Sequence, residues 1–238
     1  MRDKNATRIA ALRAAFPFTL PIMAGFLFLG MTYGVYMVQS GFRFWYPMLT
    51  SLTVFGGSLE FVIVTLLQGA FNPLQALVMT LMIQARHLFY GVSMLDKYRG
   101  TGLKKLYLIF GMCDETFSVN CAADVPPDVD RGWFMFFVTL LDQFYWFTGA
   151  TLGALCGMLI RFNTRGLDFS MTALFVVIFM EQWKKDPQHI SALIGLILPA
   201  LCLLIFGSER FLLPSMAAIL IALALLKRPI ERKGGEAA

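Results

Sequence analysis

Two adjacent carboxylates in an otherwise uncharged stretch are the side chains best suited to chemistry in this sequence. Asp114 and Glu115 have eight uncharged residues on each side, 106–113 and 116–123. Within a membrane, a charged side chain costs on the order of 3 kcal/mol, so this pair needs a cation, water or protons beside it. Adjacent like charges disfavour double ionisation, and one of the two carboxyls can therefore hold an exchangeable proton near neutral pH.

Arg86 is the natural partner of these carboxylates. It lies near the middle of an apolar run, and Tyr90 follows it by four residues, on the same face of a helix. Because each charge would be costly alone, we predict that Arg86 contacts Asp114 or Glu115. Two simpler interpretations stay open: a cation that extends to the membrane boundary, and an ion pair with a structural role only.

Glu60 is the only charge in the 42 residues between Arg43 and Arg86. It follows Gly57 and Ser58, and glycines loosen a helix. This setting favours a substrate or proton site, whereas the alternative is a structural carboxylate that accepts hydrogen bonds from neighbouring backbone.

Asp142 and His87 are further candidates for substrate binding or coupling. Asp142 lies in an apolar span beside Gln143 and Trp146, and it either faces the same interior or forms an interhelical hydrogen bond. His87 adjoins Arg86, and one histidine cannot make a metal site. We therefore predict no metal and no cofactor.

The composition indicates that these side chains lie in a membrane protein. Hydrophobic residues make up 58% of the 238 residues and charged residues only 15%, so a soluble domain could not cover its surface. The net charge of +5 comes from cations in short segments between apolar runs. This pattern reports membrane topology rather than nucleic-acid binding.

We predict an all-α integral membrane protein, a polytopic bundle of about six to eight hydrophobic segments. Residues 1–238 form a single membrane domain. Its parts are a basic cytoplasmic N-terminus (1–13), a first half (14–123), an outer loop (124–132), a second half (133–226) and a basic tail (227–238). The expected segments are 14–42, 45–70, 73–95, 106–123, 133–160, 169–183, 190–207 and 211–226.

Full crossing by every segment would separate the basic stretches onto opposite sides of the membrane. One broken or re-entrant segment in each half removes this conflict and leaves the N-terminus, the 97–105 loop and the tail in the cytoplasm. Irregular backbone at membrane depth occurs where protein buries it or a cavity wets it, and paired broken helices are typical of transporters with repeats.

A face of glycines on the 133–160 segment predicts close helix packing. Gly149, Gly153 and Gly157 recur every four residues. Such a face suits a neighbouring helix, and we expect it to receive a small membrane subunit or a second copy of the chain.

The residues together favour a transporter of a small zwitterion. A binding site for an amino acid with an apolar side chain needs a cationic group, an anionic group and an apolar pocket. Arg86 supplies the first, Glu60 or Asp114 the second, and the many Phe, Met and Leu side chains the third. A channel or structural subunit is the alternative; an intramembrane enzyme is less favoured because no activated nucleophile or paired metal-ligand spacing is present.

Three sequence segments resemble motifs of a known family. They are Gly57-Ser58-Leu59-Glu60-Phe61, Ala85-Arg86-His87-Leu88-Phe89-Tyr90-Gly91-Val92-Ser93 and Asp114-Glu115-Thr116-Phe117. Their order and spacing are similar to those in the large subunit of the AzlC-type branched-chain amino acid exporters, over about residues 14–226.

The resemblance implies a bacterial inner-membrane exporter of valine, leucine, isoleucine or their analogues that works with a small hydrophobic AzlD-type subunit. No P-loop is present, so coupling to protons is expected. Two positions depart from the family, which commonly has glutamine in place of Glu60 and asparagine or aspartate in place of Gln84. These departures indicate an altered substrate or coupling ion.

Overall fold

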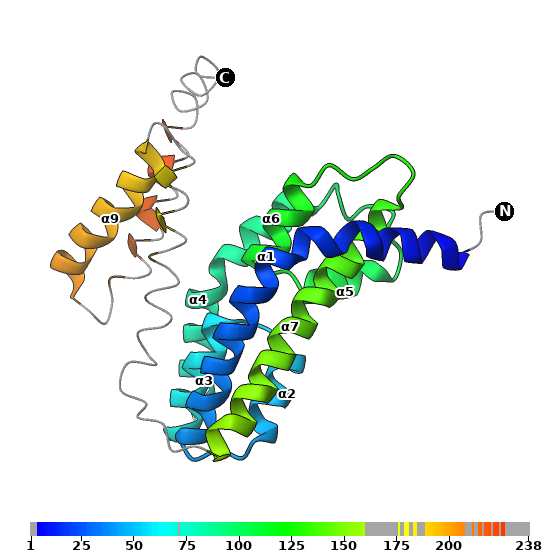
Figure 1. Cartoon of the computed structure of the whole chain (residues 1–238). Helices are drawn as coiled ribbons and strands as arrows, with labels where there is room; N and C mark the ends of the chain where they lie inside the picture. Colours follow the sequence, from blue (N-terminus) through cyan, green and yellow to red (C-terminus); the bar gives the residue numbers. More distant parts are fainter. Residues whose placement is uncertain are drawn as a thin grey trace. The chain divides into compact units, whose positions relative to one another are not determined.

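The computed structural model is helical in every element that it describes. It describes residues 4–70, 72–159 and 189–207, together with 176, 179–180, 183–184, 211, 214–215, 217–219, 221–223 and 225–226. The chain forms two units, Met1–Ser170 and Met171–Ala238 (Figure 1).

Seven helices belong to the described part of the first unit. They are α1 (Lys4–Gln39), α2 (Trp45–Thr53), α3 (Ser58–Gln68), α4 (Pro73–Met94), α5 (Lys104–Phe110), α6 (Asp114–Ala122) and α7 (Arg131–Leu159). The second unit contains α9 (Ile190–Phe206), which matches the expected 190–207 segment. The expected 169–183 segment lies largely outside the described residues and the basic tail wholly outside them, whereas most of the 211–226 segment is described.

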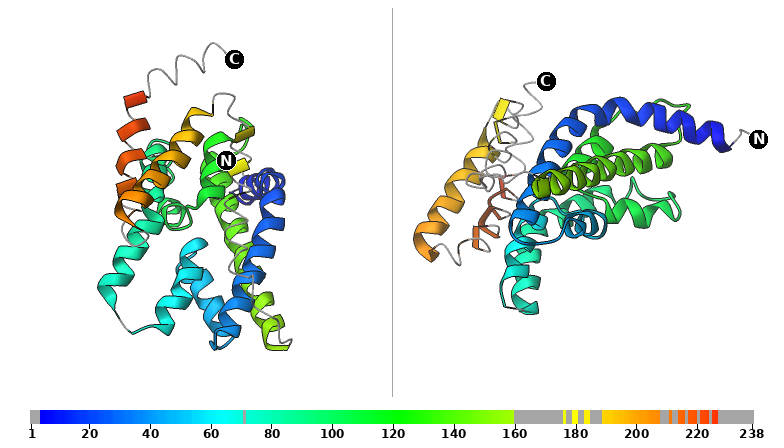
Figure 2. Two further views of the ribbon diagram at one scale, coloured as in Figure 1. Left: turned by 90° about the vertical axis from the view of Figure 1, so that its left-hand side faces the viewer. Right: turned by 60° about the horizontal axis from the view of Figure 1, so that its bottom comes forward.

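The two long helices α1 and α7 lie side by side in the first unit (Figure 2). Their backbones touch: a Cβ added to Gly34 would lie 2.1 Å from the carbonyl oxygen of Ala150, and one added to Gly153 would lie 2.1 Å from that of Met31. Small residues allow this approach, and α1 also accommodates Pro17 and Pro21.

The predicted use of the glycine face on α7 is therefore wrong in part. It is a packing face, but the helix that it receives is α1 of the same chain. A Cβ on Gly149 would lie 2.7 Å from the Leu27 carbonyl oxygen, and Gln39 Nε2 donates to the carbonyl oxygen of Gly157 at 2.8 Å. A partner subunit has no room at this face; the existence of a partner stays a prediction.

Two of the expected segments are broken. The 45–70 segment divides into α2 and α3 at Val54–Gly57, where Phe55 and Gly57 have positive φ angles of 44° and 49°. The 106–123 segment divides into α5 and α6 at Gly111–Cys113. Both breaks lie within residues 14–123; the corresponding part of the second half is largely outside the described residues.

The breaks move the acidic residues to helix starts. Glu60 lies in the first turn of α3, and Asp114 and Glu115 lie in the first turn of α6. The backbone N–H groups of a helix start favour negative charge. A carboxylate at either helix start is therefore stabilised by the backbone N–H groups there. In the middle of an unbroken helix it would lack this stabilisation.

The surface of the helices is apolar, as a lipid environment requires. Within α1, Thr7–Gln39 is long and apolar enough to cross a membrane, and Ser58–Gln68 and Ile190–Phe206 are shorter apolar helices. Large hydrophobic side chains such as Phe28, 63% exposed, face outward. The placement of loops inside or outside the cell stays a prediction.

Candidate functional site

An ion pair between α4 and α6 forms the centre of the site. Arg86 Nη2 lies 3.0 Å from Asp114 Oδ2, and the Tyr90 hydroxyl donates to Asp114 Oδ1 at 2.7 Å. Arg86 and Tyr90 are one turn apart on α4, so one helix face supplies both groups. The predicted contact between Arg86 and the acidic pair is confirmed.

Arg86 also reaches the start of α3. Its Nη2 donates to Ser58 Oγ at 3.4 Å, and Ser58 is the first residue of α3, directly after the Gly57 turn. The guanidinium therefore joins the starts of both helices that follow a break. The Arg86 and Asp114 side chains are 32% and 27% exposed, so this ion pair is open to a ligand in the first unit.

Glu60 occupies a different environment from Asp114. Its side chain is fully buried, and Oε1 accepts hydrogen bonds from the Gly56 N–H at 3.2 Å and from Trp146 Nε1 at 3.0 Å. Among the described residues Glu60 has no ion pair within 4.0 Å. It thus lies at the first break but apart from the guanidinium of Arg86, packed against α7.

Asp142 is also fully buried, and neither carboxyl oxygen has a hydrogen-bond partner in the described part of the chain. The interhelical hydrogen bond considered for it is absent there. Its neighbour Gln143 makes such bonds instead, donating to the Leu52 carbonyl oxygen at 3.2 Å and accepting from the Tyr107 hydroxyl at 2.6 Å. Gln143 thereby connects α7 to α2 and α5.

The remaining predicted site residues lie beside this centre. Glu115 follows Asp114 on α6 and has no ion pair within 4.0 Å among the residues described. The His87 ring packs edge-on against Tyr90 at 5.5 Å between ring centroids. Gly57 supplies the turn that begins α3.

Asp142 was predicted as a site residue, but the contacts of its neighbours on the same face of α7 were not. Thr139, Gln143 and Trp146 each contact a broken segment: a Cβ added at Gly111 would overlap Thr139 Cγ2, Gln143 donates to the Leu52 carbonyl oxygen, and Trp146 donates to Glu60. The spacing of Trp146 from Asp142, one turn, was the available signal.

The geometry suits binding of a charged, zwitterionic ligand rather than metal chemistry. A guanidinium and a carboxylate are adjacent, partly exposed and aligned with two helix starts. In the described ranges, no three His, Cys, Asp or Glu side chains gather closely enough to hold a metal ion.

These features define a helical membrane protein with a charged site between interrupted helices. Residues 21–160 match the AzlC protein family, described as "AzlC protein", and the chain belongs to this family. No solved structure matches the chain.

Similar proteins cover nearly all of the chain. It is 60% identical to the "Branched-chain amino acid transport protein AzlC" of Bacillus subtilis over 97% of this chain and 91% of that protein. An uncharacterized membrane protein of Haemophilus influenzae is 47% identical over 94% and 92%, and one of Helicobacter pylori 26695 is 35% identical over 94% and 98%.

Proposed function

We propose that this chain is the large subunit of a secondary transporter that exports branched-chain or similar small apolar amino acids across the bacterial inner membrane. Export is coupled to protons and requires a small AzlD-type membrane subunit. The observation that carries this proposal is the ion pair between Arg86 and Asp114, partly exposed at the two helix breaks. The name and the 60% identity of the Bacillus subtilis relative support the substrate class.

An ion pair of this kind can exchange partners with a zwitterion. The substrate carboxylate binds Arg86, and its ammonium binds Asp114, so one ion pair is replaced by two. Neither charge of the protein is left alone at membrane depth at any stage, which avoids the cost of an unpaired charge. Tyr90 holds Asp114 in place through its hydroxyl. The N-terminus of α3 adds a positive electrostatic potential beside Arg86, where the substrate carboxylate binds.

The coupling proton is carried by carboxyls other than Asp114. Glu60 and Asp142 are fully buried and have no cation within 4.0 Å in the described part of the chain. A buried carboxylate without a cation is costly, and binding a proton removes that cost. Glu115, next to Asp114, is the third carboxyl available for coupling because the two like charges oppose joint ionisation.

The test uses labelled leucine in membrane vesicles that contain the full chain and its small partner. We expect leucine counterflow without a gradient, and accumulation against a concentration gradient when a pH gradient is imposed. An uncoupler should collapse the accumulation and spare counterflow. Leucine movement that only follows its own gradient would instead identify a channel, and a new labelled product would identify an enzyme.

The partner is tested by leaving it out. Vesicles with the chain alone should show little leucine counterflow, and addition of the small subunit should restore it. Full activity of the chain alone, measured as a monomer, would contradict this part of the proposal. A homo-oligomer would be recognised by its size in detergent.

A further inference from the structure

A cavity in the first unit lies next to the charged site and has the character of a side-chain pocket. Its volume is about 440 Å³, towards the lower end of the range for small-molecule sites. One face of α4 forms one wall, with Leu88, Gly91 and Val92 among its residues, and Ile109 and Met112 form the other. The walls are therefore mainly aliphatic.

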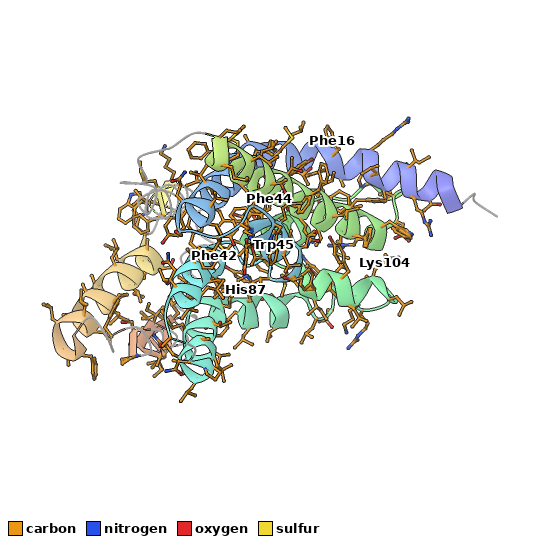
Figure 3. All side chains as sticks on the ribbon, turned by 90° about the horizontal axis from the view of Figure 1, so that it is seen from below. Phe16, Phe42, Phe44, Trp45, His87 and Lys104 are labelled. Carbon is orange, nitrogen blue, oxygen red and sulfur yellow. The ribbon has the colours of Figure 1, made fainter. Side chains whose placement is uncertain are left out.

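The cavity begins where the charged site ends. His87, the residue after Arg86, lines it, and so does Met112, two residues before Asp114. The His87 ring packs against Tyr90, whose hydroxyl holds Asp114 (His87 is labelled in Figure 3). A ligand anchored at the ion pair would thus have an aliphatic space within reach.

One buried polar atom of the lining, Gln84 Oε1, has no hydrogen-bond partner in the described part of the chain. Gln84 lies two residues before Arg86 on α4. Buried polar atoms are nearly always hydrogen-bonded, so this oxygen is available to a polar ligand group or a water molecule. Leu95, Tyr98 and Lys105 also line the cavity, and Leu95 is 58% exposed.

We propose that this cavity binds the aliphatic side chain of the transported amino acid and that Gly91, on its α4 wall, sets the size that is accepted. The inference rests on the proposed function and adds to it the residues that select the substrate. The ligand class is an amino acid with a branched aliphatic side chain, anchored by its charged groups at Arg86 and Asp114.

Gly91 offers a clean way to change the cavity. A Cβ there would lie 3.7 Å from Met112 Cε, an ordinary contact, so alanine fits without moving the backbone. Alanine also favours a helix over glycine by about 1 kcal/mol, and loss of folding is not expected. The added methyl group lies beside Met112, and both residues line the cavity.

The experiment compares labelled valine and leucine in counterflow with the full chain and its partner. Gly91→Ala should lower the leucine-to-valine ratio about tenfold, the effect of one methylene group in an apolar pocket. Ile109→Ala, on the opposite wall and 50% exposed, should raise the acceptance of larger side chains such as phenylalanine. Gly25→Ala is the matched control because no atom lies within 4 Å of its added Cβ.

The outcomes separate this inference from the proposed function. Opposite shifts in the two variants, with the control unchanged, support the pocket. Unchanged selectivity in both variants, while the wild-type chain exchanges leucine, overturns the pocket alone and assigns the cavity to a lipid chain or a packed helix. A wild-type chain that exchanges no branched-chain amino acid overturns the proposed function and this inference with it.

Discussion

The two helix breaks use the same local device with opposite results. Each places an acidic residue in the first turn of the helix that follows, Glu60 in α3 and Asp114 in α6. Glu60 is sealed from solvent and bonded to Trp146, whereas Asp114 is 27% exposed and paired with Arg86. Local geometry alone therefore does not set the role of an acid at a helix start; its neighbours on α4 and α7 do.

This difference suggests that the two kinds of carboxyl have different roles. Asp114, which is partly exposed, can exchange its ion-pair partner for a substrate, whereas the buried carboxyls of Glu60 and Asp142 can exchange only a proton. Substitutions at these residues and at their neighbours test these roles.

Replacing Arg86 with alanine should have the largest effect. The change leaves Asp114 without its cation and removes the contact with Ser58. Removing one partner of a partly buried charge pair costs about 2 kcal/mol or more, so leucine counterflow should fall at least about 30-fold. Arg99→Ala is the matched control, because Arg99 is 85% exposed and its 3.8 Å pair with Asp96 lies at the surface. Equal loss in both variants would contradict a binding role for Arg86.

Replacing Tyr90 with phenylalanine should have an intermediate effect. The ring and its packing against Phe117 remain, but the 2.7 Å hydrogen bond to Asp114 is lost. A hydrogen bond to a charged group contributes about 1.5–3 kcal/mol, so the apparent affinity for leucine should fall about tenfold or more. The measurement is the concentration dependence of counterflow, with Tyr46→Phe as control. An unchanged affinity would show that Tyr90 does not position the ion pair.

Neutralising the sealed acids together should separate exchange from coupling. Glu60→Gln keeps an oxygen that can accept a hydrogen bond from Trp146 Nε1, and Asp142→Asn preserves the size of that side chain. The double variant should exchange leucine at close to the wild-type rate but fail to accumulate it under a pH gradient, because no proton binds at either position. Asp124→Asn, in an exposed loop, is the control. If the double variant still accumulates leucine under a pH gradient, the coupling proton is assigned to Glu115 instead.

Replacing Trp146 with phenylalanine should have the smallest effect. It removes the donor at 3.0 Å from Glu60 Oε1. If Glu60 is protonated, the free energy of unfolding loses an ordinary hydrogen bond, about 1 kcal/mol, and the packing of the larger ring, which is 4% exposed. Thermal unfolding in detergent measures this change, and the same substitution made together with Glu60→Gln measures the packing part alone. A loss that is much larger with Glu60 than with Gln at this position would show that Glu60 is charged and depends on Trp146.

Much of the fold could be predicted because lipid imposes strong limits on sequence. The apolar run that contains α1 and the one that contains α7 are read directly from their length and composition. The contact of Arg86 with the acidic pair was also predictable, because an unpaired charge in apolar surroundings is costly and opposite charges there form ion pairs. The helical breaks were expected from topology, but their positions and number were not.

The amino-acid sequence alone identifies the charges that cannot be left unpaired in a membrane and the helices that carry them. Which of these charges is exposed and which is buried follows from tertiary packing. Trp146 reaches Glu60 across 86 positions of the chain, and the glycines of α7 receive α1 rather than a partner. Such contacts depend on how helices distant in sequence pack, which no local pattern of residues encodes.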